Sequence, residues 1–164
     1  MKHLFIINPA AGSYNQTEDY RKKIADICEA KGLDYSIRIS GAPGRCRKIA
    51  REAAESGREY RIYACGGDGT LNEVVNGAAL HPHAAVGCYP CGSGNDFVKY
   101  YGGKKYFSDI GAGIDRNRCY HSIDRDRRCA LQELGRNLCV GGPCQRKSHR
   151  IMEQHEDKCF KRRE

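Results

Sequence analysis

The sequence predicts an α/β fold in which helices cover both faces of a parallel sheet. Short apolar runs alternate along the chain with longer segments whose apolar residues recur at helical spacing. The first run, "HLFII" at residues 3–7, is apolar apart from His3, which is typical of a strand buried on both faces. Strands that alternate with helices in this way are joined by right-handed crossovers, so their carboxyl ends lie at one edge of the sheet.

The elements follow one another regularly from residue 3 to residue 90. We expect strands at residues 3–7, 33–40, 60–65 and 84–90, and helices at residues 17–31, 41–57 and 70–80. The helical stripe is clear in the first helix, where Tyr20, Ile24 and Cys28 recur every fourth residue and Gly32 supplies a stop. Residues 105–115, "KYFSDIGAGID", are expected to add one more strand and a turn.

Length and charge suggest one domain followed by a basic tail. The 164 residues suit a single domain with its own core. Residues 1–115 carry 15 Lys and Arg against 13 Asp and Glu, whereas residues 116–164 carry 13 against 7. The tail has little apolar periodicity, so we expect it to be poorly ordered. Its basic side chains are expected to be solvated, and its scattered Cys and His residues lack the paired C-x2-C spacing of a zinc site.

The chain has no run of about 18 apolar residues, the length that a membrane-spanning helix needs. The short apolar start runs directly into Asn8 and Pro9, which favours a buried strand over an export signal. We therefore expect a cytoplasmic protein with reduced cysteines, and peripheral contact with a membrane is left open.

The segment "GGDGT", residues 66–70, directly follows the third predicted strand. Glycines there let the backbone approach a phosphate, and the start of the next helix offers unpaired N–H groups. We expect Thr70 to cap that helix and to form a capping box with Glu73. Asp68 would repel a phosphate unless it holds Mg²⁺, a ligand hydroxyl or a proton in transfer. The alternative is a tight turn in which Asp68 forms an Asx motif.

Two more polar loops follow predicted strands. "NPAAG" at residues 8–12 follows the first strand, and "PCGSGNDF" at residues 90–97 overlaps the end of the fourth. Since parallel strands end at the same edge, the three loops should converge there, where open α/β sheets bind ligands. Asp96 is expected to cap the helix that follows the third loop.

Together, "IINPAAG", "GGDGTLNEVVNG" and "PCGSGNDFVKYYG" resemble the catalytic domain of the diacylglycerol kinase and sphingosine kinase superfamily, most closely its bacterial soluble lipid kinases. The resemblance covers residues 1–103. It implies a three-layer, Rossmann-like nucleotide-binding domain of the type shared with NAD kinases and phosphofructokinases. It also implies that ATP, with Mg²⁺, phosphorylates a diacylglycerol-type lipid hydroxyl.

Carried over residue by residue, the resemblance implies a set of nucleotide contacts along the three loops and at the end of the second strand. They are Asn8, Gly12, Ser40, Gly66, Gly67, Asp68, Gly69, Thr70, Leu71, Asn72 and Ser93. Asp68 is the one carboxylate in a matching motif that could assist an acceptor hydroxyl, so it is also the candidate catalytic residue.

Family members carry a second, β-rich domain, and residues 104–115 resemble one of its early strands. Most of that domain is expected to be missing, and we expect no resemblance after Asp115. The expected partners are ATP and a lipid acceptor at a membrane surface, without nucleic acid, and a homodimer is left open. Two alternatives remain, an NAD kinase-like enzyme, which would share "GGDGT", and a catalytically incomplete ATP-binding module.

Overall fold

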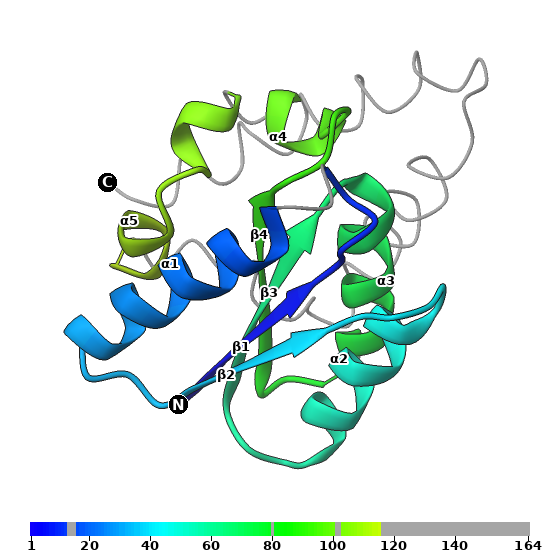
Figure 1. Cartoon of the computed structure of the whole chain (residues 1–164). Coiled ribbons are helices and arrows are strands. Elements are labelled where there is room, and N and C mark those ends of the chain that lie inside the picture. The colour runs from blue at the N-terminus through cyan, green and yellow to red at the C-terminus, as the bar shows by residue number, and fades with distance from the viewer. Residues whose placement is uncertain (13–15, 80, 101–102, 116–164) are drawn as a thin grey trace, which may run out of the picture.

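A computed structural model describes residues 1–12, 16–79, 81–100 and 103–115. Its sheet has the order β2-β1-β3-β4 and all three strand pairings are parallel. The strands are β1 (Lys2–Ile7), β2 (Tyr35–Ile39), β3 (Tyr60–Gly66) and β4 (Ala84–Pro90). The helices are α1 (Gln16–Ala30), α2 (Arg45–Glu55), α3 (Asp68–Ala78), α4 (Asp96–Tyr100) and α5 (Ile110–Asp115). The predicted fold class is confirmed (Figure 1).

Helices cover both faces of the sheet, as Figure 1 shows. Leu4 and Ile6 of β1 belong to a buried cluster with residues of α2, α3 and α4. Phe5 and Ile7, whose side chains alternate with them along the strand, belong to a second cluster with residues of α1 and α5. A strand buried on both sides explains why residues 4–7 are all apolar.

The predicted strand within residues 105–115 is wrong, because this segment is helical. A 3-10 helix spans Lys104–Tyr106 and α5 follows it. Ile110 and Ile114 are four residues apart and both are buried in the cluster beside α1, which is the spacing of one helix face. The Asp109 Oδ1 atom accepts the Ala112 N–H at 2.9 Å, so Asp109 acts as the N-terminal cap.

The five cysteines in the described part of the chain are free thiols, namely Cys28, Cys46, Cys65, Cys88 and Cys91. Burial raises the pKa of Cys28 to about 11 and that of Cys88 to about 12. These thiols therefore stay protonated at neutral pH, in line with the expectation of reduced cysteines. The remaining cysteines, with the rest of the basic tail, lie outside the described residues.

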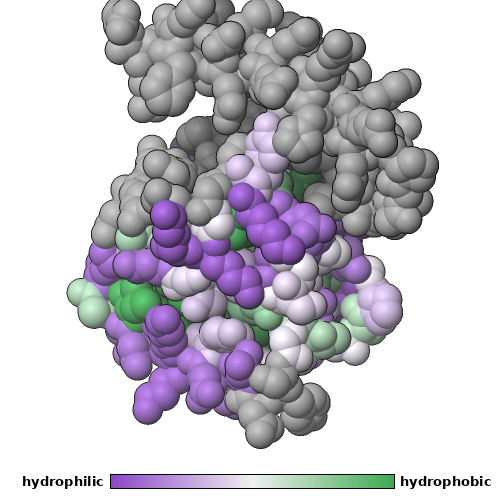
Figure 2. Space-filling view, turned by 90° about the horizontal axis from the view of Figure 1, so that it is seen from above, coloured by the Kyte–Doolittle hydropathy of each residue, from purple (hydrophilic) through white to green (hydrophobic). Residues whose placement is uncertain are grey.

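The surface of the described residues is mainly hydrophilic in the view from above, with small separate hydrophobic areas (Figure 2). Within the described ranges, none of the helices combines the length and the apolar character needed to cross a membrane.

The burial of His3 is expected to make the stability of this fold sensitive to pH. It is buried in β1, where its Nδ1 atom lies 3.2 Å from the Tyr63 hydroxyl and its ring stacks on the Tyr63 ring. Burial lowers the pKa of His3, and the positive charge of Arg61 lowers it further. The unfolded chain therefore takes up a proton at higher pH than the folded chain, and stability falls as the pH drops below about 6.5.

We expect the free energy of unfolding to fall between pH 7.5 and 5, with a His3 contribution of at most about 1.4 kcal/mol per pH unit. Urea unfolding of the wild type and of His3→Gln at several pH values measures this contribution. The Gln side chain keeps hydrogen-bonding groups but does not titrate, so its curve should be flatter. Parallel pH curves for the two proteins would show that His3 does not control this dependence.

Candidate functional site

The site begins at the point where the chain reverses its direction across the sheet. From β1 the chain passes to β2 on one side and then returns across β1 to β3 on the other. The reversal places a topological switch point between the carboxyl ends of β1 and β3, the usual ligand position in open α/β sheets. Asn8 follows β1 at this point, and Gly67 follows β3.

Asn8 joins the first of the three predicted loops to the second. Its backbone N–H donates to the Cys65 carbonyl at 3.0 Å, and its Nδ2 group donates to the Thr70 Oγ1 atom at 2.9 Å. Its Oδ1 atom accepts the Ala10 N–H at 3.0 Å, which tightens its own loop. Two predicted site residues that are 62 positions apart in the sequence, Asn8 and Thr70, are thus in direct contact.

The second and third loops approach each other through glycine. The Cys91 N–H donates to the Gly66 carbonyl at 3.0 Å. A Cβ atom on Gly92 would lie 2.6 Å from the Gly67 Cα atom, and one on Gly66 would overlap the Thr70 side chain. Neither position has room for a larger residue, so the glycines are needed for the loops to lie this close.

Gly12 brings the first loop to the third. Its φ of +97° is in the region that favours glycine, and a Cβ atom there would lie 2.9 Å from the Cys91 carbonyl oxygen. The predicted convergence of the three loops at one edge of the sheet is therefore confirmed.

Helix α3 starts in the middle of this convergence, with Gly67 as its N-cap residue. The Leu71 N–H donates to the Gly67 carbonyl at 3.0 Å, which closes the first turn. The N–H groups of Asp68, Gly69 and Thr70 precede this bond, so they have no acceptor within the helix. Such a helix start carries a partial positive charge that favours an anion.

The predicted capping box between Thr70 and Glu73 is wrong. Helix α3 begins two residues before Thr70, at Asp68, and the Thr70 hydroxyl accepts the Asn8 amide instead. The Glu73 carboxylate accepts the N–H groups of Gly44 at 3.0 Å and Arg47 at 3.4 Å, which lie at the start of α2. Glu73 therefore caps a neighbouring helix and not its own.

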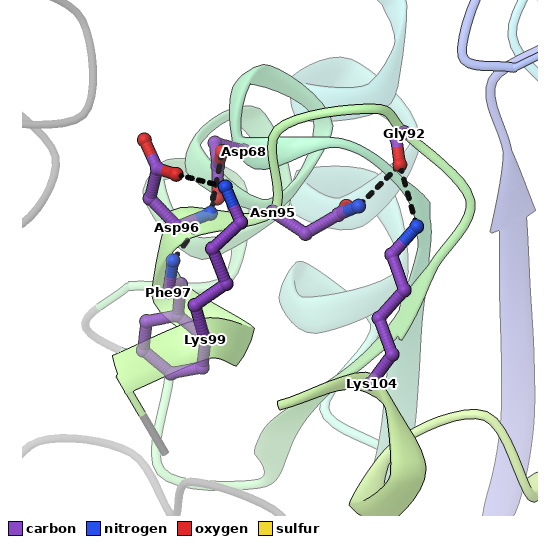
Figure 3. Close-up of polar contacts among 7 residues, drawn as sticks. All are labelled: Asp68, Gly92, Asn95, Asp96, Phe97, Lys99 and Lys104. Atoms are coloured by element: carbon purple, nitrogen blue, oxygen red, sulfur yellow. Dashed lines mark hydrogen bonds and ion pairs between the residues drawn. The ribbon is translucent and has the colours of Figure 1, made fainter. Parts of the chain in front are cut away.

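Asp68 holds the start of α4. Its carboxylate accepts the Asp96 N–H at 2.9 Å and the Phe97 N–H at 3.3 Å (Figure 3). The prediction that Asp96 caps this helix is wrong, because the exposed Asp96 carboxylate pairs with the Lys99 ammonium at 2.9 Å. Asp68 thus ties the β3–α3 loop to the loop after β4.

Replacing Asp68 with alanine is expected to lower the free energy of unfolding by about 1 kcal/mol, since two N–H groups of α4 lose their acceptor. Asp96→Ala is the matched control, because an exposed ion pair contributes only about 0–1 kcal/mol. Urea unfolding of both variants makes the comparison. If Asp96→Ala lowered the free energy of unfolding more than Asp68→Ala, the assignment of Asp68 as the cap of α4 would be contradicted.

The other predicted site residues differ in how much of them a ligand could reach. Ser40 is buried, and its N–H donates to the Ile7 carbonyl at 2.8 Å. Its hydroxyl forms a hydrogen bond with the Cys46 thiol, and burial raises the pKa of that thiol. Leu71 is buried in the core. The Asn72 side chain accepts the Asn76 amide. Gly69 and Ser93 are exposed at the convergence of the loops.

Three residues of this region, Gly92, Asn95 and Lys104, are absent from the predicted contacts. The Gly92 carbonyl accepts both the Asn95 Nδ2 group and the Lys104 Nζ group, the latter at 3.2 Å (Figure 3). The pair of glycines in "CGSG" could have pointed to Gly92, whereas Lys104 lies 12 positions further along, in the segment that resembles a strand of the second domain and outside the three nucleotide loops. Among the described residues, no three His, Cys, Asp or Glu side chains are grouped so that they could hold a metal ion.

Comparison with known proteins identifies the family. The model of the diacylglycerol kinase catalytic domain matches residues 2–122. The chain belongs to this family. The match continues past Asp115, so the prediction that the resemblance ends there is wrong.

Its relatives include named diacylglycerol kinases. The chain is 38% identical to the diacylglycerol kinase of Bacillus subtilis strain 168 over 59% of its own length and 32% of that protein. It is 35% identical to the diacylglycerol kinase of Staphylococcus carnosus strain TM300 over 84% of its own length and 44% of the relative. Its structure superposes on the crystal structure of a diacylglycerol kinase from Bacillus anthracis strain Sterne with a TM-score of 0.54 and 25% sequence identity. The superposition covers 71% of this chain and 44% of that one. The chain thus spans less than half the length of these relatives.

Proposed function

We propose that this chain provides the ATP-binding part of a lipid kinase, which transfers the γ-phosphate of ATP to the hydroxyl of a diacylglycerol-type lipid. Family membership and the diacylglycerol kinases among its relatives support the lipid kinase class. The relatives are more than twice as long as the matched region, so the acceptor and the transfer step are part of the proposal.

The convergence of the three loops around the start of α3 is the observation that carries the proposal. Gly66, Gly67 and Gly92 keep side chains away from this point, as the distances to an added Cβ atom show for Gly66 and Gly92. Backbone N–H groups at the first turn of α3 can then approach phosphate oxygens without steric hindrance. The hydrogen bond from Asn8 to Thr70 holds the first two loops together in this arrangement.

Phosphoryl transfer depends mainly on positioning the donor and acceptor and on stabilising the developing charge. In the proposed site, the α3 amides hold the phosphates and Ser93 contributes its exposed hydroxyl and amide. Mg²⁺ is proposed to arrive with ATP, bound to its phosphates. Asp68 remains the proposed aid to the acceptor hydroxyl, although its two N–H contacts already give it a structural role.

The test is a binding and transfer experiment on the purified chain. Isothermal titration with ATP and Mg²⁺ measures binding, and γ-labelled ATP with diacylglycerol in mixed micelles measures transfer. We expect ATP to bind more tightly than adenosine, because the contacts are to phosphates. An absence of ATP binding would overturn the proposal, and phosphorylation of NAD in place of lipid would assign the chain to the NAD kinase-like alternative.

A second candidate is an ATP-binding module that does not transfer phosphate on its own. The observation that favours it is the Asp68 carboxylate, the one candidate aid to an acceptor, which already accepts the N–H groups of Asp96 and Phe97. ATP binding without labelled lipid would support this candidate, and labelled lipid would exclude it.

A further inference from the structure

Lys104 makes a contact with the third loop that no motif predicts. Its Nζ group donates to the Gly92 carbonyl at 3.2 Å, and the Asn95 Nδ2 group donates to the same oxygen (Figure 3). Asn95 is buried and has a φ of 53°, in the left-handed region, and its bond to Gly92 ties its side chain to the loop. The Gly92 carbonyl is therefore fixed from two directions.

The backbone of Lys104 is itself held in place. Gly103 precedes it with a φ of +88°, and its N–H donates to the Val98 carbonyl at 2.8 Å. The Lys104 carbonyl accepts the N–H groups of Phe107 and Ser108, both at 2.9 Å, and the Ser108 hydroxyl at 2.7 Å. The ammonium group thus extends toward Gly92 from a well-bonded turn.

Fixing the Gly92 carbonyl also fixes the amide that follows. A trans peptide is planar, and its C=O and N–H groups point in opposite directions. Because the carbonyl faces Lys104 and Asn95, the Ser93 N–H faces away from both. The Gly92 Cα atom packs against Gly67, the N-cap of α3, so this amide lies in the loop next to the first turn of α3.

We propose that Lys104 is a positioning residue of the nucleotide site, which holds the Gly92–Ser93 peptide so that the Ser93 N–H and hydroxyl are presented to the phosphates. This inference rests on the proposed ATP binding. The charge of Lys104 also acts on Cys91 of this loop. Burial raises the pKa of the Cys91 thiol to about 11, and the positive charge of Lys104 lowers that pKa.

The test compares Lys104→Met with Lys104→Arg and with Lys48→Met. Methionine keeps an unbranched side chain but has no donor, whereas arginine keeps both donor and charge. Lys48 is the matched control, because its exposed ammonium pairs with Glu52 on α2 and its loss changes the net charge equally. Titrations with ATP and with adenosine, thermal unfolding without ligand, and hydrogen exchange of the Cys91 amide are measured for each variant.

We expect Lys104→Met to weaken ATP binding about tenfold, or ~1.4 kcal/mol, and to leave adenosine binding unchanged. The Cys91 amide, bonded to the Gly66 carbonyl, should exchange faster while the melting temperature stays near that of the wild type. Lys104→Arg and Lys48→Met should bind ATP like the wild type. Equal ATP affinity in Lys104→Met and the wild type would overturn the inference and leave the proposed function standing. A wild type that does not bind ATP would overturn both.

Discussion

Gly77→Ala is expected to lower the free energy of unfolding by about 2 kcal/mol, even though alanine is the better helix former by about 1 kcal/mol. Gly77 lies in α3 where this helix packs on α2. An added Cβ atom would overlap the Arg47 carbonyl oxygen and lie 2.8 Å from the Ala50 Cβ atom. Backbone atoms cannot turn aside as a side chain can, so the two helices would have to move apart.

Urea unfolding measures this effect, with Gly113→Ala in α5 as the control. A Cβ atom on Gly113 meets nothing within 4 Å, so that substitution should leave stability equal or slightly higher. If Gly77→Ala were as stable as the wild type, the close packing of α2 on α3 would be wrong.

Gly67→Val is expected to weaken ATP binding by more than tenfold, or ~1.4 kcal/mol, without unfolding the protein. A Cβ atom on Gly67 would lie 3.6 Å from the Gly92 Cα atom, which is an ordinary contact. The fold can therefore accept a Cβ atom here, whereas a side chain would block the proposed approach of phosphates to the first turn of α3. In this variant, ATP binding should weaken while the melting temperature stays near that of the wild type.

The measurements are ATP titration and thermal unfolding, with Gly113→Val as the control for a branched side chain at an open glycine. Unchanged ATP affinity in a folded Gly67→Val protein would show that the phosphates do not lie at this loop. A variant that loses both binding and its melting transition would instead show that the space beside Gly67 is needed for folding.

The sheet and its helices could be predicted because their patterns are local. The apolar run at residues 3–7 and the stripe of Tyr20, Ile24 and Cys28 each depend on neighbouring positions, and they correspond to β1 and α1. The convergence of the three loops also followed from the sequence, because parallel strands must end at one edge.

Partners that lie far apart in the sequence could not be predicted in the same way. Glu73 stands three residues after Thr70 and fits a capping box, but its partners are at the start of α2, 26 and 29 positions away. Asp68 and Asp96 are the first residues of α3 and α4, and only the packing of the two loops shows that Asp68 caps α4. For residues 105–115, Ile110 and Ile114 fit a helix as well as a short strand, and contact with α1 decides between them.

The cap formed by Glu73 has a consequence for where a negatively charged ligand is attracted. Four described helices, α1, α2, α3 and α4, begin at the carboxyl edge of the sheet, and each start carries a partial positive charge. The first turn of α1 holds two carboxylates of its own, Glu18 and Asp19. Carboxylates from α3 lie on two of these starts, Glu73 on α2 and Asp68 on α4, whereas the N-cap of α3 is a glycine without a side-chain bond. With α2 and α4 capped in this way, the first turn of α3 is the one of these three starts that keeps its backbone amides for an anion, and the anion approaches it beside the Asp68 carboxylate of the same turn.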